Sequence, residues 1–261
     1  MKRTRIYPNL EDLPKNFYGI LQNAAAYDSS CSPAARVLFI EKDGGYYLKS
    51  AEKGSLAREA AMARYFHDKG LGAEVLGYYT DTRDWLLTAR VPGEDATHAT
   101  YLAEPRRLAV LLGETLRALH EIDAAGCPVP DHRVCYLATA EQNYRAGQFD
   151  TSGLPPALTP ATPEAAWHTV CEGKHLLQQE VLLHGDYCLP NVMLDNWKPS
   201  GFVDLGNGGV GDRHVDLYWG AWTLCFNLKT DRYRDLFFDA YGRDLIDPDR
   251  LRIVGAIETF G

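Results

Sequence analysis

Three oxygen-bearing side chains at fixed spacing carry the clearest chemical signal in this chain of 261 residues. Residues 184–191 read HGDYCLPN, which contains Asp186 and Asn191, and Asp204 follows in the segment GFVDLG. Phosphoryl transfer needs a carboxylate that orients or accepts the proton of an attacking hydroxyl, and oxygen ligands that hold Mg²⁺ against the phosphates. The spacing therefore predicts Asp186 as the base and Asn191 and Asp204 as metal ligands, together at one end of a small sheet.

The same chemistry needs a cation for the phosphates, and the best candidate lies on an upstream hairpin. Residues 36–50 read RVLFIEKDGGYYLKS, in which two β-rich runs flank Asp-Gly-Gly, a strong hairpin signal. Tyr47 and Lys49 are two positions apart on the second strand and share one face. Glu59 falls on the following helix, expected over 55–69 with Ser55 as its N-cap, and is the natural ion-pair partner of Lys49.

The remaining pattern indicates a β-rich N-terminal lobe and a mainly helical C-terminal lobe. Further strands are expected at 74–79 and 84–89, and Pro92-Gly93 then marks a boundary that predicts lobes 1–93 and 94–261. Beyond it, the apolar periodicity predicts helices and short strands around a Pro-rich segment, 150–163, which is expected to be a lid or a mobile loop. The helices are expected at 106–123, from Asp212 onward, at 230–242 and at 248–258, and the strands at 181–186, 192–195 and 201–206.

Several residues near these motifs are expected to have structural roles. His184 and Asp216 are interpreted as braces of the loop that carries Asp186, and His120 as a core or helix-end histidine. Cys188 lies inside the motif but is expected to be a small packing residue, because no base for a thiolate can be argued from the sequence. The aromatic residues Tyr218, Trp219 and Trp222 are expected in the core.

Charge and composition narrow the possible partners. The net charge is −8, and it is uneven: residues 1–93 hold 13 basic and 11 acidic residues, and residues 94–261 hold 14 and 24. This acidic C-terminal part favours a cationic small molecule and, without a basic cluster, argues against nucleic acid. The longest nearly apolar run, 217–226, is too short to span a membrane. No apolar leader follows the first residues and none of the six cysteines forms a C-x-x-C pair, so we expect reduced thiols in a cytoplasm.

These motifs resemble those of kinases. H-G-D-x-x-x-x-N followed by D-L-G is similar to the H-R-D-x-x-x-x-N and D-F-G of protein kinases, with Gly185 in place of Arg. The layout as a whole resembles the aminoglycoside 3′-phosphotransferases, the kanamycin kinase group, through CSPAARV (31–37), YYLKS (46–50), LLTARVPG (86–93) and the stretch 184–216. The resemblance implies an α+β, two-lobed protein-kinase-like fold, with a small β-rich N-terminal lobe and a larger, mainly helical C-terminal lobe.

The resemblance also implies roles for individual residues. Asp186 would be the catalytic aspartate, and Asn191 and Asp204 would hold Mg²⁺. ATP would be bound through the phosphate lysine, its acidic partner, a phosphate-cradling serine, an aromatic that stacks on adenine and two hinge residues: Lys49, Glu59, Ser32, Tyr47, Ala89 and Val91. The acceptor would be bound by residues of the C-terminus and of the D-L-G-N turn: Glu258, Phe260, Gly261 and Asn207.

The sequence departs from the family pattern at positions expected to bind the acceptor, so the resemblance does not fix which acceptor is used. Asn207 stands where several relatives have Arg, Ile257 replaces an acidic residue, and the segment 150–163 is poor in acids. The leading hypothesis is ATP- and Mg²⁺-dependent phosphorylation of an aminoglycoside hydroxyl, the 3′ position, which would give antibiotic resistance. The alternatives are a metabolic kinase of the same fold, for choline, homoserine or a fructosamine, and a nucleotide-binding protein without turnover. A monomer or a dimer is expected.

Overall fold

The computed structural model describes residues 3–8, 13–151 and 160–261, and its residues group into two compact units. The first unit consists of residues 1–95 with 193–206, and the second consists of residues 96–192 with 207–261. The expected lobe boundary after Gly93 stays a prediction, because the grouping also assigns the later segment 193–206 to the first unit. Most of the expected lid, residues 152–159, lies outside the described residues.

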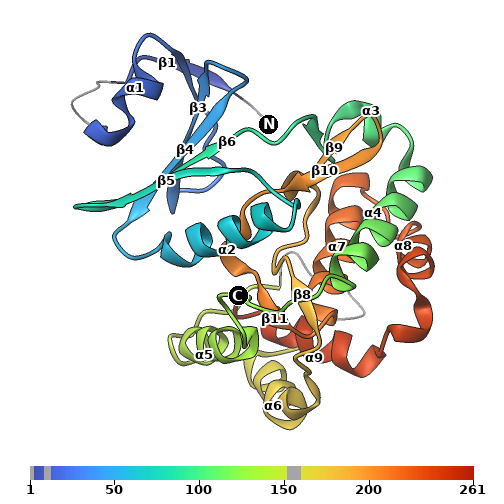
Figure 1. The fold of residues 1–261 in the computed structure, drawn as a ribbon. Helices are drawn as coiled ribbons and strands as arrows, with labels where there is room; N and C mark the ends of the chain where they lie inside the picture. Colours follow the sequence, from blue (N-terminus) through green and yellow to red (C-terminus); the bar gives the residue numbers. More distant parts are fainter. Residues whose placement is uncertain (1–2, 9–12, 152–159) are drawn as a thin grey trace. The chain divides into compact units, whose positions relative to one another are not determined.

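A six-stranded antiparallel sheet forms the body of the first unit (Figure 1). Its spatial order is β1-β2-β3-β4-β6-β5, so all but one of its neighbouring strands are consecutive in the chain. The strands are β1 (Thr4–Ile6), β2 (Ala25–Asp28), β3 (Ala35–Glu41), β4 (Tyr46–Glu52), β5 (Val75–Thr80) and β6 (Arg83–Ala89). The hairpin predicted at 36–50 is confirmed as β3 and β4, closed where the N–H of Gly45 donates to the carbonyl of Lys42 at 2.8 Å.

The two faces of this sheet are covered by different helical segments. Leu48 belongs to a buried cluster with residues of η2 (Lys15–Phe17) and α1 (Tyr18–Leu21), whereas Ala51 packs with residues of α2 (Ala57–Asp68). Successive strand residues face opposite sides. Lys49 therefore shares the face of Ala51, which is the face that α2 covers.

The N-terminus of α2 differs from the prediction. Ser55 is not its cap, because the Ser55 hydroxyl donates to the carbonyl of Glu52 at 2.6 Å. The N–H groups of Gly54 and Leu56 instead donate to Oδ2 of Asp84, at 2.9 and 3.0 Å. A carboxylate from β6 thus fixes the backbone immediately before α2, and the N-cap residue, Leu56, makes no side-chain capping hydrogen bond.

A small three-stranded sheet completes the first unit, in the order β10-β9-β7. Its strands are β7 (Glu94–Asp95), β9 (Val192–Asp195) and β10 (Lys198–Phe202). The predicted strand at 192–195 is confirmed, whereas the one predicted at 201–206 is wrong in its bounds, because the strand ends at Phe202 and the chain turns into η6 (Leu205–Asn207). Asp204 therefore lies in the turn after the strand.

The second unit is mainly helical, with one short antiparallel pair of strands, β8 (Val181–Leu183) and β11 (Gly209–Gly211). The α-helices are α3 (Ala99–Leu102), α4 (Pro105–His120), α5 (His132–Arg145), α6 (Pro163–Gly173), α7 (His214–Leu228), α8 (Arg234–Tyr241) and α9 (Pro248–Glu258); the 3₁₀ turns are η4 (Lys174–Leu176), η5 (Leu189–Asn191) and η7 (Arg243–Leu245). The helices predicted at 106–123, from Asp212 and at 248–258 are confirmed to within a few residues. Among the described residues, no helix combines the length and apolarity that a membrane crossing requires.

Candidate active site

The first unit brings three of the predicted residues into one ion-pair cluster. Nζ of Lys49 lies 2.7 Å from Oε2 of Glu59 and 2.8 Å from Oδ1 of Asp204. The Lys49 and Glu59 side chains are largely buried, whereas the Asp204 side chain is 54% exposed. β4, α2 and the turn after β10 each supply one member, so residues far apart in the sequence meet around a single ammonium group.

The charges of this cluster set its protonation. Burial alone would lower the pKa of Lys49, but the carboxylates of Glu59 and Asp204 outweigh it and raise that pKa above its ordinary value. Burial raises the pKa of Glu59, and the Lys49 charge opposes that effect. Lys49 is therefore a permanent cation at neutral pH, held by one buried and one exposed carboxylate.

The backbone at Asp204 is itself unusual. Its φ is +60°, in the left-handed region that non-glycine residues adopt rarely, although aspartate tolerates it better than most. This conformation ends the course of β10 and turns the carboxylate toward Lys49. The contact between Asp204 and Lys49 was not predicted from the sequence, and the predicted role of Asp204 as a metal ligand stays a prediction.

The second unit holds Asp186 and Asn191 in direct contact. Nδ2 of Asn191 donates to Oδ2 of Asp186 at 2.9 Å and to its carbonyl at 3.0 Å, across the turn η5. Gly185 precedes them with φ at +83°, and a Cβ there would lie 2.0 Å from the carbonyl oxygen of Asn207. Glycine is therefore required at this position, where protein kinases have the arginine of H-R-D.

Asp216 on α7 fixes the loop that carries Asp186 through hydrogen bonds to its backbone. Its Oδ2 accepts from the N–H of His184 at 2.7 Å and its Oδ1 accepts from the N–H of Gly185 at 2.8 Å. His120 adds a third hydrogen bond from Nε2, at 3.1 Å, and its Nδ1 lies 2.8 Å from the Tyr241 hydroxyl. Asp216 therefore braces the loop as expected. His120, expected as a core or helix-end histidine, also contributes to this brace through its hydrogen bond to Asp216.

The protonation states in this brace follow from its hydrogen bonds. Burial alone would raise the pKa of Asp216, but the hydrogen bonds from His120 and His184 lower it below the ordinary value. Burial lowers the pKa of His120, so the ring stays neutral, and the contacts fit a tautomer that donates from Nε2 to Asp216 and accepts at Nδ1 from Tyr241. Asp216 is thus a buried anion whose donors are largely backbone groups of the Asp186 loop.

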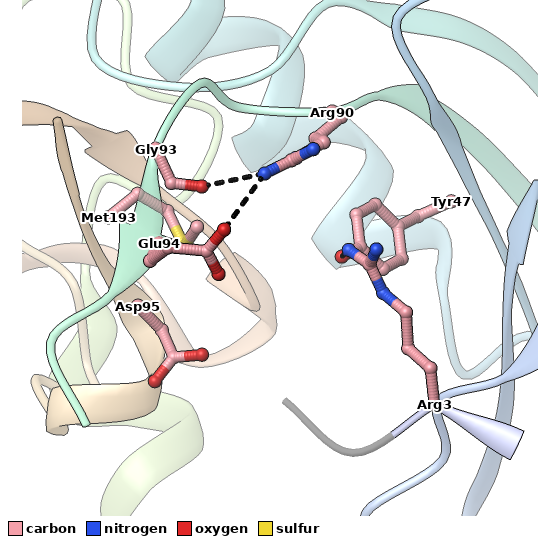
Figure 2. Close-up of a pocket in the computed structure, with 7 residues that line it drawn as sticks. All are labelled: Arg3, Tyr47, Arg90, Gly93, Glu94, Asp95 and Met193. Atoms are coloured by element: carbon pink, nitrogen blue, oxygen red, sulfur yellow. Dashed lines mark hydrogen bonds and ion pairs between the residues drawn. The ribbon is translucent and has the colours of Figure 1, made fainter. Parts of the chain in front are cut away.

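A cavity of about 140 Å³ lies in the first unit beside Tyr47, the residue expected to stack on adenine (Figure 2). Its lining includes two arginines and two acids and consists of Arg3, Tyr47, Arg90, Gly93, Glu94, Asp95 and Met193. Arg90 is engaged with the Gly93 carbonyl at 2.9 Å and with Oε1 of Glu94 at 3.3 Å. Sequence reasoning missed Arg3, which lies outside the recognised motifs, and Met193, which lies within the stretch 184–216 but carries no chemical signal of its own.

The other residues predicted to bind the nucleotide do not line this cavity. The Ala89 N–H donates to the carbonyl of Glu74 at 2.9 Å, so a base could meet Ala89 only at its carbonyl. Val91 is buried, and Ser32 lies in the exposed turn between β2 and β3, where its hydroxyl accepts from the Ala34 N–H at 3.1 Å. The roles of Ser32, Ala89 and Val91 in nucleotide binding stay predictions.

Glu258, at the end of α9, is held by two side-chain donors in the second unit. Its Oε1 accepts from the hydroxyl of Tyr136 at 2.6 Å and from Nε1 of Trp219 at 3.2 Å. Burial raises the pKa of Glu258 to about 7, and the nearby charge of Asp186 adds to that effect. Trp219, expected simply as a core residue, therefore also orients the carboxylate of Glu258.

The other predicted acceptor residues differ in exposure. Phe260 is 1% exposed and packs against an aromatic cluster, while its carbonyl accepts from Nδ2 of Asn143 at 2.6 Å and its N–H donates to the carbonyl of Ile257 at 2.9 Å. The cluster consists of Tyr144, Phe149 and Trp167. Asn207 and Gly261 are exposed. Their roles in acceptor binding stay predictions.

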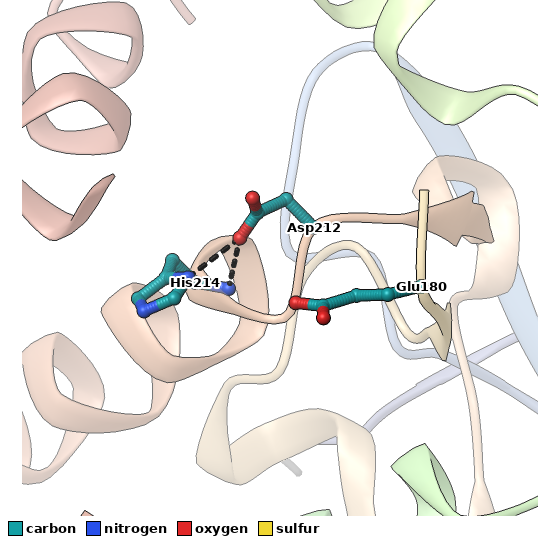
Figure 3. Close-up of side chains that lie close together, drawn as sticks. All are labelled: Glu180, Asp212 and His214. Atoms are coloured by element: carbon teal, nitrogen blue, oxygen red, sulfur yellow. Dashed lines mark hydrogen bonds and ion pairs between the residues drawn. The ribbon is translucent and has the colours of Figure 1, made fainter. Parts of the chain in front are cut away.

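Two further groups of reactive side chains have structural explanations. Burial raises the pKa of the Cys188 thiol, which agrees with its expected role in packing. Glu180, Asp212 and His214 lie close together (Figure 3), but Asp212 accepts from His214 Nδ1 at 2.6 Å and Glu180 pairs with Arg213 at 2.8 Å. Arg250 lies 3.5 Å from Asp212 and 3.6 Å from Glu180, so both carboxylates have arginine partners and need no metal ion to balance their charge.

Comparison with known proteins places these features in a family context. The model of the phosphotransferase enzyme family matches residues 29–254. A probable aminoglycoside 3′-phosphotransferase of Lactococcus lactis is 49% identical over 264 residues, covering 100% of this chain and 99% of that protein. An aminoglycoside 3′-phosphotransferase of Niallia circulans is 33% identical over 177 residues, covering 68% of this chain and 67% of that protein.

Solved structures agree with the fold that the sequence resemblance implies. The aminoglycoside-3′-phosphotransferase of type VIII superposes with a TM-score of 0.79 at 22% identity, covering 97% of this chain and 99% of that one. The aminoglycoside phosphotransferase APH(3″)-Id from Streptomyces rimosus, in complex with ADP and streptomycin, superposes with a TM-score of 0.72 at 22% identity, covering 86% and 90%. The expected α+β, protein-kinase-like fold is thereby confirmed.

Proposed function

This chain belongs to the phosphotransferase enzyme family, and from that premise we propose that it transfers the γ-phosphoryl group of ATP to the 3′-hydroxyl of an aminoglycoside, giving resistance to it. The observation that carries the proposal is the cluster in which Lys49 is paired with both Glu59 and Asp204. Such a cluster presents one fixed cation and one exposed carboxylate to a phosphate chain and its metal, the arrangement that kinases use.

The nucleotide is assigned to residues of the first unit. Lys49, kept charged by its two carboxylates, binds the α- and β-phosphates, and buried Glu59 keeps its ammonium group in place. The half-buried ring of Tyr47 beside the cavity offers a stacking face for the base. The carboxylate of Glu94 at the same cavity is suited to accept hydrogen bonds from ribose hydroxyls.

The side-chain oxygens of Asn191 and Asp204 also suit Mg²⁺ as ligands. Asn191 commits its amide nitrogen to Asp186, which leaves its amide oxygen for a cation, and Asp204 exposes half of its carboxylate side chain. Oxygen ligands of this kind are those that Mg²⁺ prefers. When bound, the ion would neutralise phosphate charge, with Asn191 and Asp204 as its protein ligands.

Asp186 is assigned the role of base. Its carboxylate accepts a hydrogen bond from Asn191, and the Asp216 brace holds the backbone on its N-terminal side. In this role it orients the acceptor hydroxyl and takes its proton as the oxygen bonds to the γ-phosphorus and ADP departs. Removal of the proton prevents a positive charge from remaining on the new phosphate ester.

The acceptor is assigned to the second unit through charge. Ionised Glu258 would pair with a substrate ammonium group, and residues 94–261 carry 24 acidic against 14 basic residues. Charge-assisted hydrogen bonds of this kind give both affinity and orientation. A cytoplasmic location, where ATP is present and each of the six free cysteines stays reduced, fits the proposal.

A substrate panel tests the proposal. ADP release would be measured with kanamycin, neomycin, streptomycin, choline, homoserine and a fructosamine, each with ATP and Mg²⁺, and the product position would be read by mass spectrometry and NMR. We expect turnover of kanamycin and neomycin with phosphate on the 3′-oxygen. Turnover of choline, homoserine or the fructosamine alone would replace the proposal with a metabolic kinase.

A further inference from the structure

Arg3, which directly precedes β1, lies against the aromatic residues at the nucleotide cavity. Its Nη2 donates to the hydroxyl of Tyr47 at 2.9 Å. Its guanidinium carbon lies 3.5 Å from the centroid of the Phe39 ring and 6.0 Å from that of Tyr47. Figure 2 shows the guanidinium beside the Tyr47 ring on the wall of the cavity. A residue outside every recognised motif thus contacts the ring assigned to base stacking.

The surroundings make this contact specific. Phe39 is 4% exposed and its ring lies 5.2 Å from that of Tyr47, tilted by 53°. Gly45 allows the Phe39 ring to lie where it does, because a Cβ at Gly45 would come within 2.8 Å of it. The Phe39 ring is therefore held in place, and the planar guanidinium of Arg3 stacks on its face.

We propose that Arg3 is a nucleotide-positioning residue, which presets the Tyr47 ring for stacking on the base of ATP. The inference rests on the proposed function, which assigns that ring to the base. Tyr47 is half-buried, and Arg3 and Phe39 hold it at its hydroxyl end and its edge. A ring already held in its binding orientation loses less conformational freedom when a ligand stacks on it, so ATP binds more tightly.

The strand pairing explains how the N-terminus reaches this position. β1 pairs antiparallel with β2, with Thr4 opposite Asp28 and Arg5 opposite Tyr27, and β2 pairs in turn with β3. β1 therefore fixes the position of Arg3, which directly precedes Thr4. Arg5 follows two residues later, but its guanidinium lies 5.6 Å from the Tyr7 ring and does not line the cavity. Arg5, an arginine within β1 two positions further along the chain, is thus a matched control.

The test measures ATP binding with Mg²⁺ by calorimetry, without acceptor, for Arg3→Ala, Tyr47→Phe, the double variant and Arg5→Ala. We expect Arg3→Ala to weaken ATP binding about three- to tenfold, the size of one hydrogen bond or cation–aromatic contact. Tyr47→Phe removes only the hydroxyl, so the double variant should bind little worse than Arg3→Ala alone. Arg5→Ala should bind as the wild type does.

Steady-state kinetics separate positioning from a general loss of structure. For Arg3→Ala, KM for ATP should rise while KM for the aminoglycoside and the melting temperature stay near their wild-type values. Wild-type ATP affinity in Arg3→Ala overturns the inference, as does a double variant whose loss is the full product of the single losses. If Arg3→Ala unfolds, Tyr47→Phe carries the test, and its wild-type ATP affinity would equally overturn the inference. Wild-type protein that binds ATP but phosphorylates no aminoglycoside refutes the proposed function and leaves these comparisons valid.

Discussion

Replacing Glu258 by glutamine should stabilise the protein at high pH and weaken acceptor binding at the same time. Glu258 accepts hydrogen bonds from Tyr136 and Trp219 through the same oxygen, at 2.6 and 3.2 Å. A glutamine side-chain oxygen can accept both, so the variant changes the charge and keeps the contacts. Any difference between the two proteins therefore reports the cost of ionising this one carboxyl group.

The magnitude follows from the pKa of Glu258, which burial raises to about 7 from an ordinary 4.5. A shift of about 2.5 units corresponds to about 3 kcal/mol at 1.36 kcal/mol per unit, and partial exposure of the residue reduces this to about 1–3 kcal/mol. The folded state holds the proton more tightly than the unfolded state. Stability associated with Glu258 is thus present below pH 4.5 and is lost as the pH rises through 7. The glutamine variant escapes that loss.

Urea unfolding at pH 4.5 and pH 8.5 measures the effect. The free energy of unfolding of Glu258→Gln should match that of the wild type at pH 4.5 and exceed it by about 1–3 kcal/mol at pH 8.5. In the wild type, affinity for kanamycin should increase about tenfold between pH 6 and pH 8 as Glu258 ionises, and in the variant it should be weak and flat over this range. A variant that is less stable than the wild type at pH 8.5 would refute the reasoning, because it would mean that the ionised carboxylate is favoured by its surroundings.

The other predictions concern the catalytic residues and their supports. Asp186→Asn should lower kcat by about 10²–10⁴, since it removes the proton acceptor, and ATP affinity measured by calorimetry should hold; retention of more than about a tenth of kcat would show that Asp186 is not the base. Lys49→Ala should raise KM for ATP in steady-state assays and leave KM for the acceptor unchanged, and equal weakening of both would count against the phosphate role. Asp216→Ala should reduce the free energy of unfolding by about 3–5 kcal/mol, measured in urea, because buried donors of the loop lose their anion; a loss below about 1 kcal/mol would contradict the brace.

The contacts among the proposed catalytic residues could be predicted from the sequence because they depend on local spacing. The segment 184–191 alone sets Asp186 and Asn191 within hydrogen-bond distance across a short turn. The hairpin signal in residues 36–50 likewise places Lys49 on the face covered by the next helix, where Glu59 lies. In both cases few residues separate the partners, so local geometry limits where the side chains can go.

Features that depend on distant residues could not be predicted in this way. The N–H groups of Gly54 and Leu56, just ahead of α2, donate to Asp84, a strand residue that no reading of the helix sequence would select over Ser55. α5 and α6 have mixed polarity and flank a proline-rich segment, so periodicity gave no signal for them. The strands β1 and β2 are short, and their pairing depends on β3. Arg3 was missed for this reason, since its position follows from that pairing.

The unequal burial of the two carboxylates around Lys49 explains how one ammonium group can be both fixed and available. The Glu59 side chain is 11% exposed and the Asp204 side chain is 54% exposed. The contact with Glu59 is therefore shielded from water and ions, whereas the contact with Asp204 is open to exchange. Under the proposed function, an incoming phosphate would take the place of Asp204 at Nζ without disturbing the pair between Lys49 and Glu59. The Asp204 carboxylate would then be available to a cation, so that binding of one phosphate would affect both residues.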